Sequence, residues 1–103
     1  MTSNDDAEYL TIYELERTIV GTSSKDKRKT VLVNNIALFN TLENAEEAMR
    51  AYILEEKERV GEKLYYDGCL SYQICKRKVF CRPKVEIDVC TEWRSYTPDG
   101  VLT

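Results

Sequence analysis

The sequence contains no histidine. Histidine is the side chain whose pKa lies nearest neutral pH, so its absence removes the usual general base of hydrolases. A Ser-His-Asp triad, a Cys-His pair and a histidine-containing zinc site therefore cannot form within this chain. Its 4 glycines are too scattered for a phosphate-binding or dinucleotide-binding loop, and the nucleophile-elbow motif is also missing. We expect a non-enzymatic protein without a cofactor, a catalytic residue or a metal site.

Long apolar runs and an excess of basic residues are missing as well. No stretch approaches the roughly 20 apolar residues that cross a bilayer. The polar, acidic start from Met1 to Asp6 does not resemble a signal peptide. We therefore expect a cytoplasmic protein with no membrane partner. The 103 residues include 15 Lys and Arg against 18 Asp and Glu, a net charge of -3 that excludes a globally basic nucleic-acid clamp.

The four cysteines form no close pair. They are Cys69, Cys75, Cys81 and Cys90. Structural zinc sites usually draw their ligands from closely spaced pairs, so this spacing does not indicate one. In a cytoplasmic protein we expect reduced thiols that pack as small apolar side chains. The exception is Cys90, which falls on the polar side of a predicted strand, where an exposed thiol can oxidise. A cysteine-based redox or metal-binding protein is therefore one alternative function.

Residue types and apolar periodicity predict the element order β-β-α-β-β. The expected elements are strands 8–20 and 29–40, a helix over 42–60, and strands 69–80 and 84–96. The polar stretch 21–28 joins the first two strands as a hairpin, and 62–68 is expected to be a connection without regular structure. The pair Asn34–Asn35, unusual inside a strand, indicates a bulge.

The helix is the most strongly predicted element. Its apolar positions recur at helical spacing: Leu42, Ala45, Met49, Ile53 and Val60. Thr41 is a suitable N-cap, and Gly61 can end the helix in a left-handed conformation. The last strand alternates most regularly, and it predicts an inward face made of Val85, Ile87, Val89 and Trp93.

These elements predict an α+β fold in which one amphipathic helix packs on a four-stranded, mainly antiparallel sheet. We expect a disordered tail over 1–7 and a single domain over 8–103. One helix covers only part of such a sheet. The expected function is therefore an interaction module that binds a protein partner, or a second copy as a homodimer, through the uncovered sheet face or an edge strand.

Two sets of side chains are candidate sites. Tyr9, Tyr13, Tyr72 and Tyr96 are predicted to form an exposed aromatic interface patch, unless they fill the small core instead. The second set is basic and lies in or beside the predicted hairpin turns: Lys27, Arg28, Lys76, Arg77 and Lys78. If the hairpins point the same way, this set forms one positive end, and the alternative function is a nucleic-acid-binding accessory domain. Otherwise the basic residues are solvated and guard strand edges.

One short segment has a family resemblance. Residues Phe39 to Ala48, FNTLENAEEA, are similar to the strand-to-helix junction in the N-terminal arm-binding domains of tyrosine integrases. Those domains have a three-stranded sheet followed by one helix, whereas this chain has two predicted strands before its helix and two after it. The resemblance covers the junction alone, so no binding residue is transferred from that family.

Overall fold

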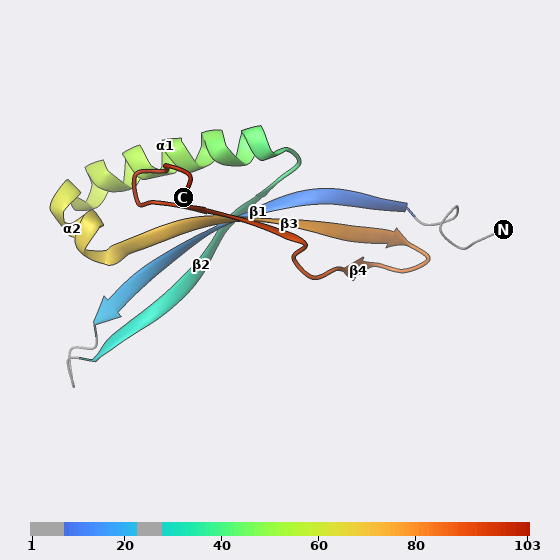
Figure 1. Ribbon diagram of the computed structural model, residues 1–103, viewed down its shortest axis with the longest axis horizontal. Helices are drawn as coiled ribbons and strands as arrows, with labels where there is room; N and C mark the ends of the chain where they lie inside the picture. The colour runs from blue at the N-terminus through green and yellow to red at the C-terminus, as the bar shows by residue number, and fades with distance from the viewer. Residues whose placement is uncertain (1–7, 23–27) are drawn as a thin grey trace.

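The computed structural model describes residues 8–22 and 28–103 (Figure 1). The elements are β1 (Glu8–Thr22), β2 (Lys29–Phe39), α1 (Leu42–Val60), α2 (Glu62–Gly68), β3 (Cys69–Arg82), β4 (Glu86–Ile87) and β5 (Glu92–Tyr96). This is an α+β fold with an antiparallel sheet, as predicted, but it has two helices and a curled sheet. The predicted tail 1–7 and the predicted site residue Lys27 lie outside the described residues.

Two long strands form the spine of the sheet. The strand order is β2-β1-β3, and both β4 and β5 pair with β3. Because β1 and β3 have 15 and 14 residues, each is about 45–50 Å long at about 3.3 Å per residue. The molecule is accordingly elongated, with extents of 58 × 31 × 22 Å. The 19 residues of α1 span only about 28 Å, so α1 covers little more than half of the spine.

A bulge interrupts the pairing of β1 with β2. Leu15 pairs with Ala37 and Glu16 with Asn35, so Ile36 is the extra, unpaired residue. It directly follows the asparagine pair that predicted a bulge. An extra residue shifts the alternation of side chains, so Ala37 and Asn34 face α1, while Leu38 and Asn35 face away from it.

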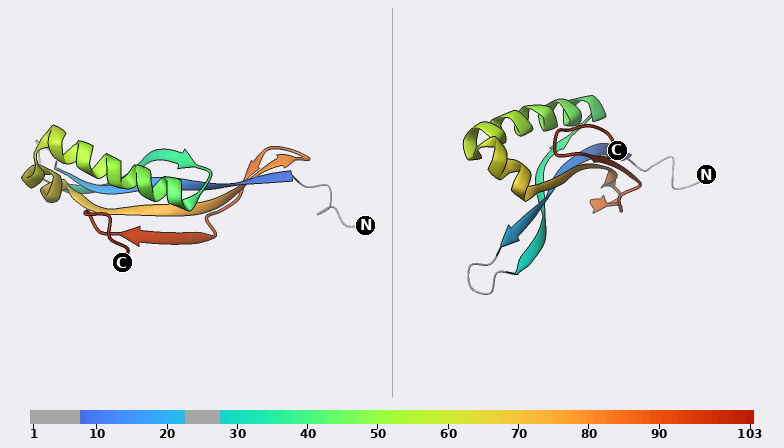
Figure 2. Two further views of the ribbon diagram at one scale, coloured as in Figure 1. Left: turned by 90° about the horizontal axis from the view of Figure 1, so that it is seen from above. Right: turned by 60° about the vertical axis from the view of Figure 1, so that its left-hand side comes forward.

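Helix α1 has the predicted bounds and the predicted caps. The Thr41 hydroxyl accepts a hydrogen bond from the backbone N–H of Asn44 at 3.1 Å. Gly61, with φ of 89°, turns the chain from α1 into α2. Figure 2 shows α1 lying across one face of the sheet. The side chains that fill the core between them are Leu15, Ala45, Met49, Ile53, Tyr65, Cys69, Tyr72, Ile74 and Tyr96.

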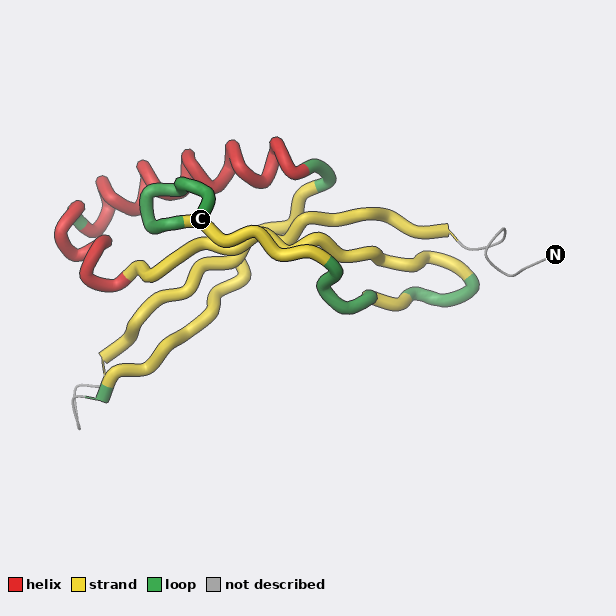
Figure 3. Tube along the Cα trace, viewed as in Figure 1, coloured by secondary structure: helices red, strands yellow, loops and turns green. Residues whose placement is uncertain are grey.

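Two sequence predictions of local structure are wrong. The segment 62–68, expected to be a connection, is α2, which is anchored by the buried Tyr65. The strand expected over 84–96 is broken into β4 and β5, and its predicted inward residues Val85, Ile87, Val89 and Trp93 are 54–77% exposed. Here β4 lies beyond the part of the sheet that α1 covers (Figure 3). The alternating side chains therefore have no second layer to pack against.

The chain ends in a turn that packs on both helices. The Gly100 N–H donates to the Thr97 carbonyl at 2.8 Å, which closes the turn. Lys57 of α1 forms an ion pair with Asp99 at 2.8 Å, and the Tyr65 hydroxyl of α2 donates to the Pro98 carbonyl at 2.8 Å. The turn thus joins the end of β5 to the helical layer.

Candidate functional site

The outer edge of β2 is the first feature of the candidate site. Strand β2 is terminal in the sheet, and no strand in the described part of the chain pairs with its outer edge. From Thr30 to Phe39 it contains no charged residue, no proline and no glycine. Edge strands usually carry charges or proline that prevent pairing with another chain. Apart from the bulge at Ile36, this edge lacks such protection.

Exposed apolar side chains accompany the free edge. Val31, Leu32, Val33 and Leu38 are 46–60% exposed. Val31, Val33 and Leu38 pair with Val20, Thr18 and Glu14 of β1, which alternate with the buried Leu15 and so face away from α1. Leu32 is on the α1 side. We call the outer edge of β2 together with these four side chains the β2 flank.

The central part of the uncovered sheet face is polar. Thr18 donates a hydrogen bond from its hydroxyl to the Gln73 side-chain oxygen at 3.0 Å, and Arg77 forms an ion pair with Glu14 at 3.3 Å. Glu16 is only 8% exposed, and burial, assisted by the neighbouring Glu14, raises its pKa to about 7. These polar groups already bond to one another. The uncovered face therefore offers exposed apolar side chains at its β2 flank and at Trp93 of β5, which is 54% exposed, rather than at its centre.

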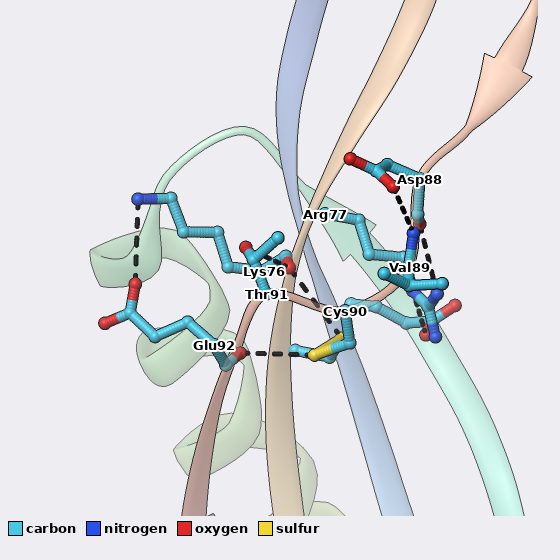
Figure 4. Close-up of a disulfide and its surroundings, with 9 residues drawn as sticks. Lys76, Arg77, Asp88, Val89, Cys90, Thr91 and Glu92 are labelled. Carbon is cyan, nitrogen blue, oxygen red and sulfur yellow. Dashed lines mark hydrogen bonds and ion pairs between the residues drawn. A yellow bond between two sulfur atoms is a disulfide. The ribbon is translucent and has the colours of Figure 1, made fainter.

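A disulfide crosses the same face near β5. Cys75 is bonded to Cys90, with their Cα atoms 5.8 Å apart (Figure 4). Cys69 and Cys81 are free. The expectation of a reduced thiol is wrong for Cys75, whereas Cys90 is the cysteine for which oxidation was allowed. The Thr91 N–H donates to the Lys76 carbonyl at 3.0 Å, and this pairing brings Cys90 beside Cys75. Because the Cys75 side chain is fully buried, the disulfide is positioned to act as a structural cross-link rather than as an accessible redox centre.

The four predicted interface tyrosines do not form one exposed patch. Tyr72 and Tyr96 are buried beneath α1, where Tyr72 shares a 2.8 Å hydrogen bond with Tyr65. Tyr13 is partly buried, and Tyr9 is half-exposed with its ring 5.6 Å from that of Phe80. The sequence showed which strand residues share a face but not which face meets the helix. The alternative, that these tyrosines fill the core, is correct for Tyr72 and Tyr96.

The predicted basic residues that the structure describes do not converge. Lys76, Arg77 and Lys78 lie within β3 and alternate between its faces: Lys76 pairs with Glu92 at 3.7 Å, and Lys78 lies 4.7 Å from the Tyr9 ring centroid.

The two hairpins also point to opposite ends of the sheet (Figure 1). Lys78 of β3 pairs with Thr11. Arg28 precedes Lys29, which pairs with Thr22 at the other end of β1. Thr22 lies eleven positions after Thr11 along β1, a distance of about 36 Å. The condition for a single positive end, that the two hairpins point the same way, is therefore not met.

An ion-pair cluster that sequence reasoning missed fixes α1 to the sheet. Glu56 accepts from Arg59 at 2.7 Å and from Arg17 at 3.4 Å, and the Arg17 guanidinium lies 5.1 Å from the Tyr52 ring centroid. The bonds from Arg59 and Arg17 hold the pKa of Glu56 below its ordinary value, against the opposing effect of burial. Only the spacing of Glu56 and Arg59 along the helix was visible in the sequence, because Arg17 belongs to β1.

Replacing Glu56 tests this cluster. We expect Glu56→Gln to lower the free energy of unfolding at pH 7 by about 2 kcal/mol, because hydrogen bonds to charged groups contribute about 1.5–3 kcal/mol. Urea denaturation measures the change. Since the folded-state pKa is depressed, this stabilisation is present above the unfolded pKa of about 4.3 and is lost as the pH falls through the folded pKa. The difference from wild type should therefore vanish in acid.

The control for this prediction is Glu55→Gln, since Glu55 is the exposed neighbour of Glu56 on the same helix. Its effect should stay within about 0.5 kcal/mol. An equal loss of stability in both variants, or a Glu56→Gln effect that does not depend on pH, contradicts the assigned role.

Small pockets and metal sites add little to this arrangement. A pocket of about 180 Å³ beneath the start of α1 is lined by Tyr13, Leu42, Ile74, Lys76, Glu92 and Arg94. Its volume is below the roughly 300–1,000 Å³ of most small-molecule sites. A second hollow, beside β4, has a volume of about 340 Å³, at the lower limit of that range. Within residues 8–22 and 28–103, no group of three metal-ligating side chains is gathered, and neither helix is long and apolar enough to span a membrane.

Comparison of the chain with protein-family models, with curated proteins and with solved structures gives no match. The functional argument therefore depends on the geometry of the chain itself, and above all on the β2 flank.

Proposed function

We propose that this protein is a small non-enzymatic interaction module that binds another polypeptide chain through the β2 flank. One observation carries the proposal: a ten-residue stretch, Thr30 to Phe39, runs without a charge along an unpaired sheet edge. Its four exposed apolar side chains adjoin the same edge. A partner strand added there gains main-chain hydrogen bonds, and the apolar side chains beside it give the contact specificity.

The physical gain from such a contact is twofold. Pairing of the outer backbone groups replaces bonds to water, while burial of apolar surface contributes about 25 cal/mol for each Å² removed from water. The centre of the uncovered face gains less, because Thr18, Gln73, Glu14 and Arg77 already bond to one another. The lack of histidine supports the non-enzymatic part of the proposal. The separation of the basic residues removes the main support for nucleic-acid binding.

The test is selective retention on an affinity matrix. Tagged wild type and the variants Val33→Lys and Val85→Lys are immobilised and exposed to a cell extract supplemented with untagged chain. Val85 is the matched control, since it is also an exposed valine but lies outside the β2 flank. Circular dichroism confirms that all three proteins are folded, and mass spectrometry quantifies the retained polypeptides.

We expect wild type and Val85→Lys to retain the same polypeptide, and Val33→Lys to retain it at least about tenfold less, equivalent to 1.4 kcal/mol. A lysine in the contact brings a charge that must lose its water there. The proposal is overturned if no retained polypeptide depends on Val33, or if both variants lose it equally.

A further inference from the structure

We infer that the chain that binds the β2 flank is a second copy of this protein, joined edge to edge through two antiparallel β2 strands related by a two-fold axis. This inference rests on the proposed function, because it names the partner of the same flank. It also specifies the register of the contact.

The first argument is that β2 is complementary to itself. Its uncharged stretch reads apolar over 31–33, amide at Asn34 and Asn35, and apolar again over 36–38. An antiparallel copy presents this order reversed, which leaves the pattern nearly unchanged. Apolar segments then meet apolar segments near the ends, and the amides meet near the axis. Contacts of this isologous kind are the usual basis of homodimers.

The bulge at Ile36 determines which residues lie opposite each other. Ala37 and Asn35 occupy successive positions of the ladder, because Ile36 is left out of the pairing. A two-fold axis through Asn34 then sets Leu32 opposite Ala37 on the α1 side, and Val31 opposite Leu38 on the other side. Opposed side chains must share a face, and both pairs satisfy this condition.

The charges at the ends of the strand are compatible with this register. Like charges directly opposite each other destabilise a sheet, and a two-fold axis sets a strand against itself. In the register centred on Asn34, Lys29 lies opposite Asn40 of the second copy rather than opposite another lysine. The acidic side chains Glu14 and Glu16 belong to β1, one strand away from the contact.

The helical layer leaves the edge accessible. Figures 1 and 2 show the last part of β1 and the first part of β2 projecting away from α1 and α2. A two-fold axis perpendicular to the sheet places both copies of α1 on the same face. The two three-stranded parts, each β2-β1-β3, would then form one continuous antiparallel sheet.

The test uses purified chain alone, so that no other partner is present. Sedimentation equilibrium at concentrations on the order of 1–100 μM is compared for wild type, Val31→Glu, Leu38→Lys and the double variant Val31→Glu/Leu38→Lys. Val85→Glu is the matched control, an exposed valine outside the flank. Circular dichroism confirms that each variant is folded.

We expect twice the chain mass of 12.0 kDa for wild type and for the control, and the single mass for each single variant. The double variant sets a carboxylate opposite an ammonium group twice across the axis. It should therefore recover the dimer mass. A double variant that dimerises shows that neither substitution unfolds the chain. The monomeric mass of each single variant is then due to loss of the contact and not to loss of the fold.

Three results would overturn the inference: a wild-type monomer at the highest concentration, a dimer that survives both single substitutions, or a double variant that stays monomeric. If wild type is monomeric while retention from the extract depends on Val33, the partner is a different protein and the proposed function stands. If neither experiment responds to β2, both proposals fail.

Discussion

Leu15→Ala is expected to lower the free energy of unfolding by about 4 kcal/mol, in the upper part of the 2–5 kcal/mol range for buried leucines. Leu15 is 0% exposed and lies between Ala37 of β2 and Ile74 of β3, beneath α1. Both neighbouring strands are held by ladder hydrogen bonds, so the cavity cannot collapse easily. A small domain is stabilised by only about 5–15 kcal/mol, so this loss is large.

Urea denaturation followed by circular dichroism measures this effect. Leu54→Ala is the matched control, because Leu54 is 66% exposed on α1 and the same atoms are removed. Its effect should stay within about 0.5 kcal/mol. A loss below about 1 kcal/mol for Leu15→Ala would show that the strand does not form the centre of the core.

Breaking the Cys75–Cys90 bond is expected to cost about 3 kcal/mol, the loop-closure value for a loop of about 15 residues. The two cysteines are separated by 15 residues in the sequence. The open chain gains conformational freedom when unfolded, whereas the folded state keeps the bond from Thr91 to Lys76. Cys90→Ser should therefore unfold at lower urea concentration than wild type.

The control is Cys81→Ser, which removes an exposed free thiol and should leave the stability within about 0.5 kcal/mol of wild type. Alkylation in denaturant provides a direct check of the bond. Two thiols, those of Cys69 and Cys81, should react before reduction, and four should react after it. Four reactive thiols without reductant would contradict the cross-link.

The same bond bears on where the protein resides. Disulfides persist in oxidising compartments and are rare in the cytosol, where thiols are kept reduced. The cytoplasmic location expected from the sequence is therefore a proposal that the Cys75–Cys90 bond argues against. Rapid alkylation in intact cells, followed by mass spectrometry, shows whether Cys75 and Cys90 are bonded there.

The sequence predicted the elements whose signals are local. Helix α1 was found at its observed bounds because its cap at Thr41, its end at Gly61 and its apolar spacing all lie within the helix or beside it. Helix α2 was missed because seven residues are too few for a periodic pattern, and the contacts of its buried Tyr65 with Tyr72 and Pro98 are long-range.

The prediction of the last strand was wrong because it relied on a local signal alone. Alternation of polar and apolar residues around Ile87 and Val89 is a local signal, but it shows a buried face only where another layer covers the sheet. The cross-link was also hidden, because nothing in the spacing of Cys75 and Cys90 shows that a bent segment returns to β3 at that point.

Only one of the two features that define the candidate site could be predicted from the sequence. The absence of charge from Thr30 to Phe39 is visible in the sequence, but it would suit a central strand equally well. What makes it a candidate contact is the strand order, in which β1 rather than β2 lies next to β3. That choice depends on pairing between residues such as Leu15 and Ile74, which are far apart in the chain.

The mismatch between a helix of about 28 Å and strands of about 45–50 Å divides the molecule into two regions of unequal cooperativity. Around Leu15 the backbone is held between neighbouring strands and a packed helix, so exposing it requires unfolding of the whole domain. Near Tyr9 and Phe80 no described helix covers the sheet. We expect the pairing of β1 with β3 to open locally there while the core stays folded. We therefore expect lower local stability at the end of the sheet that α1 does not cover than in the core.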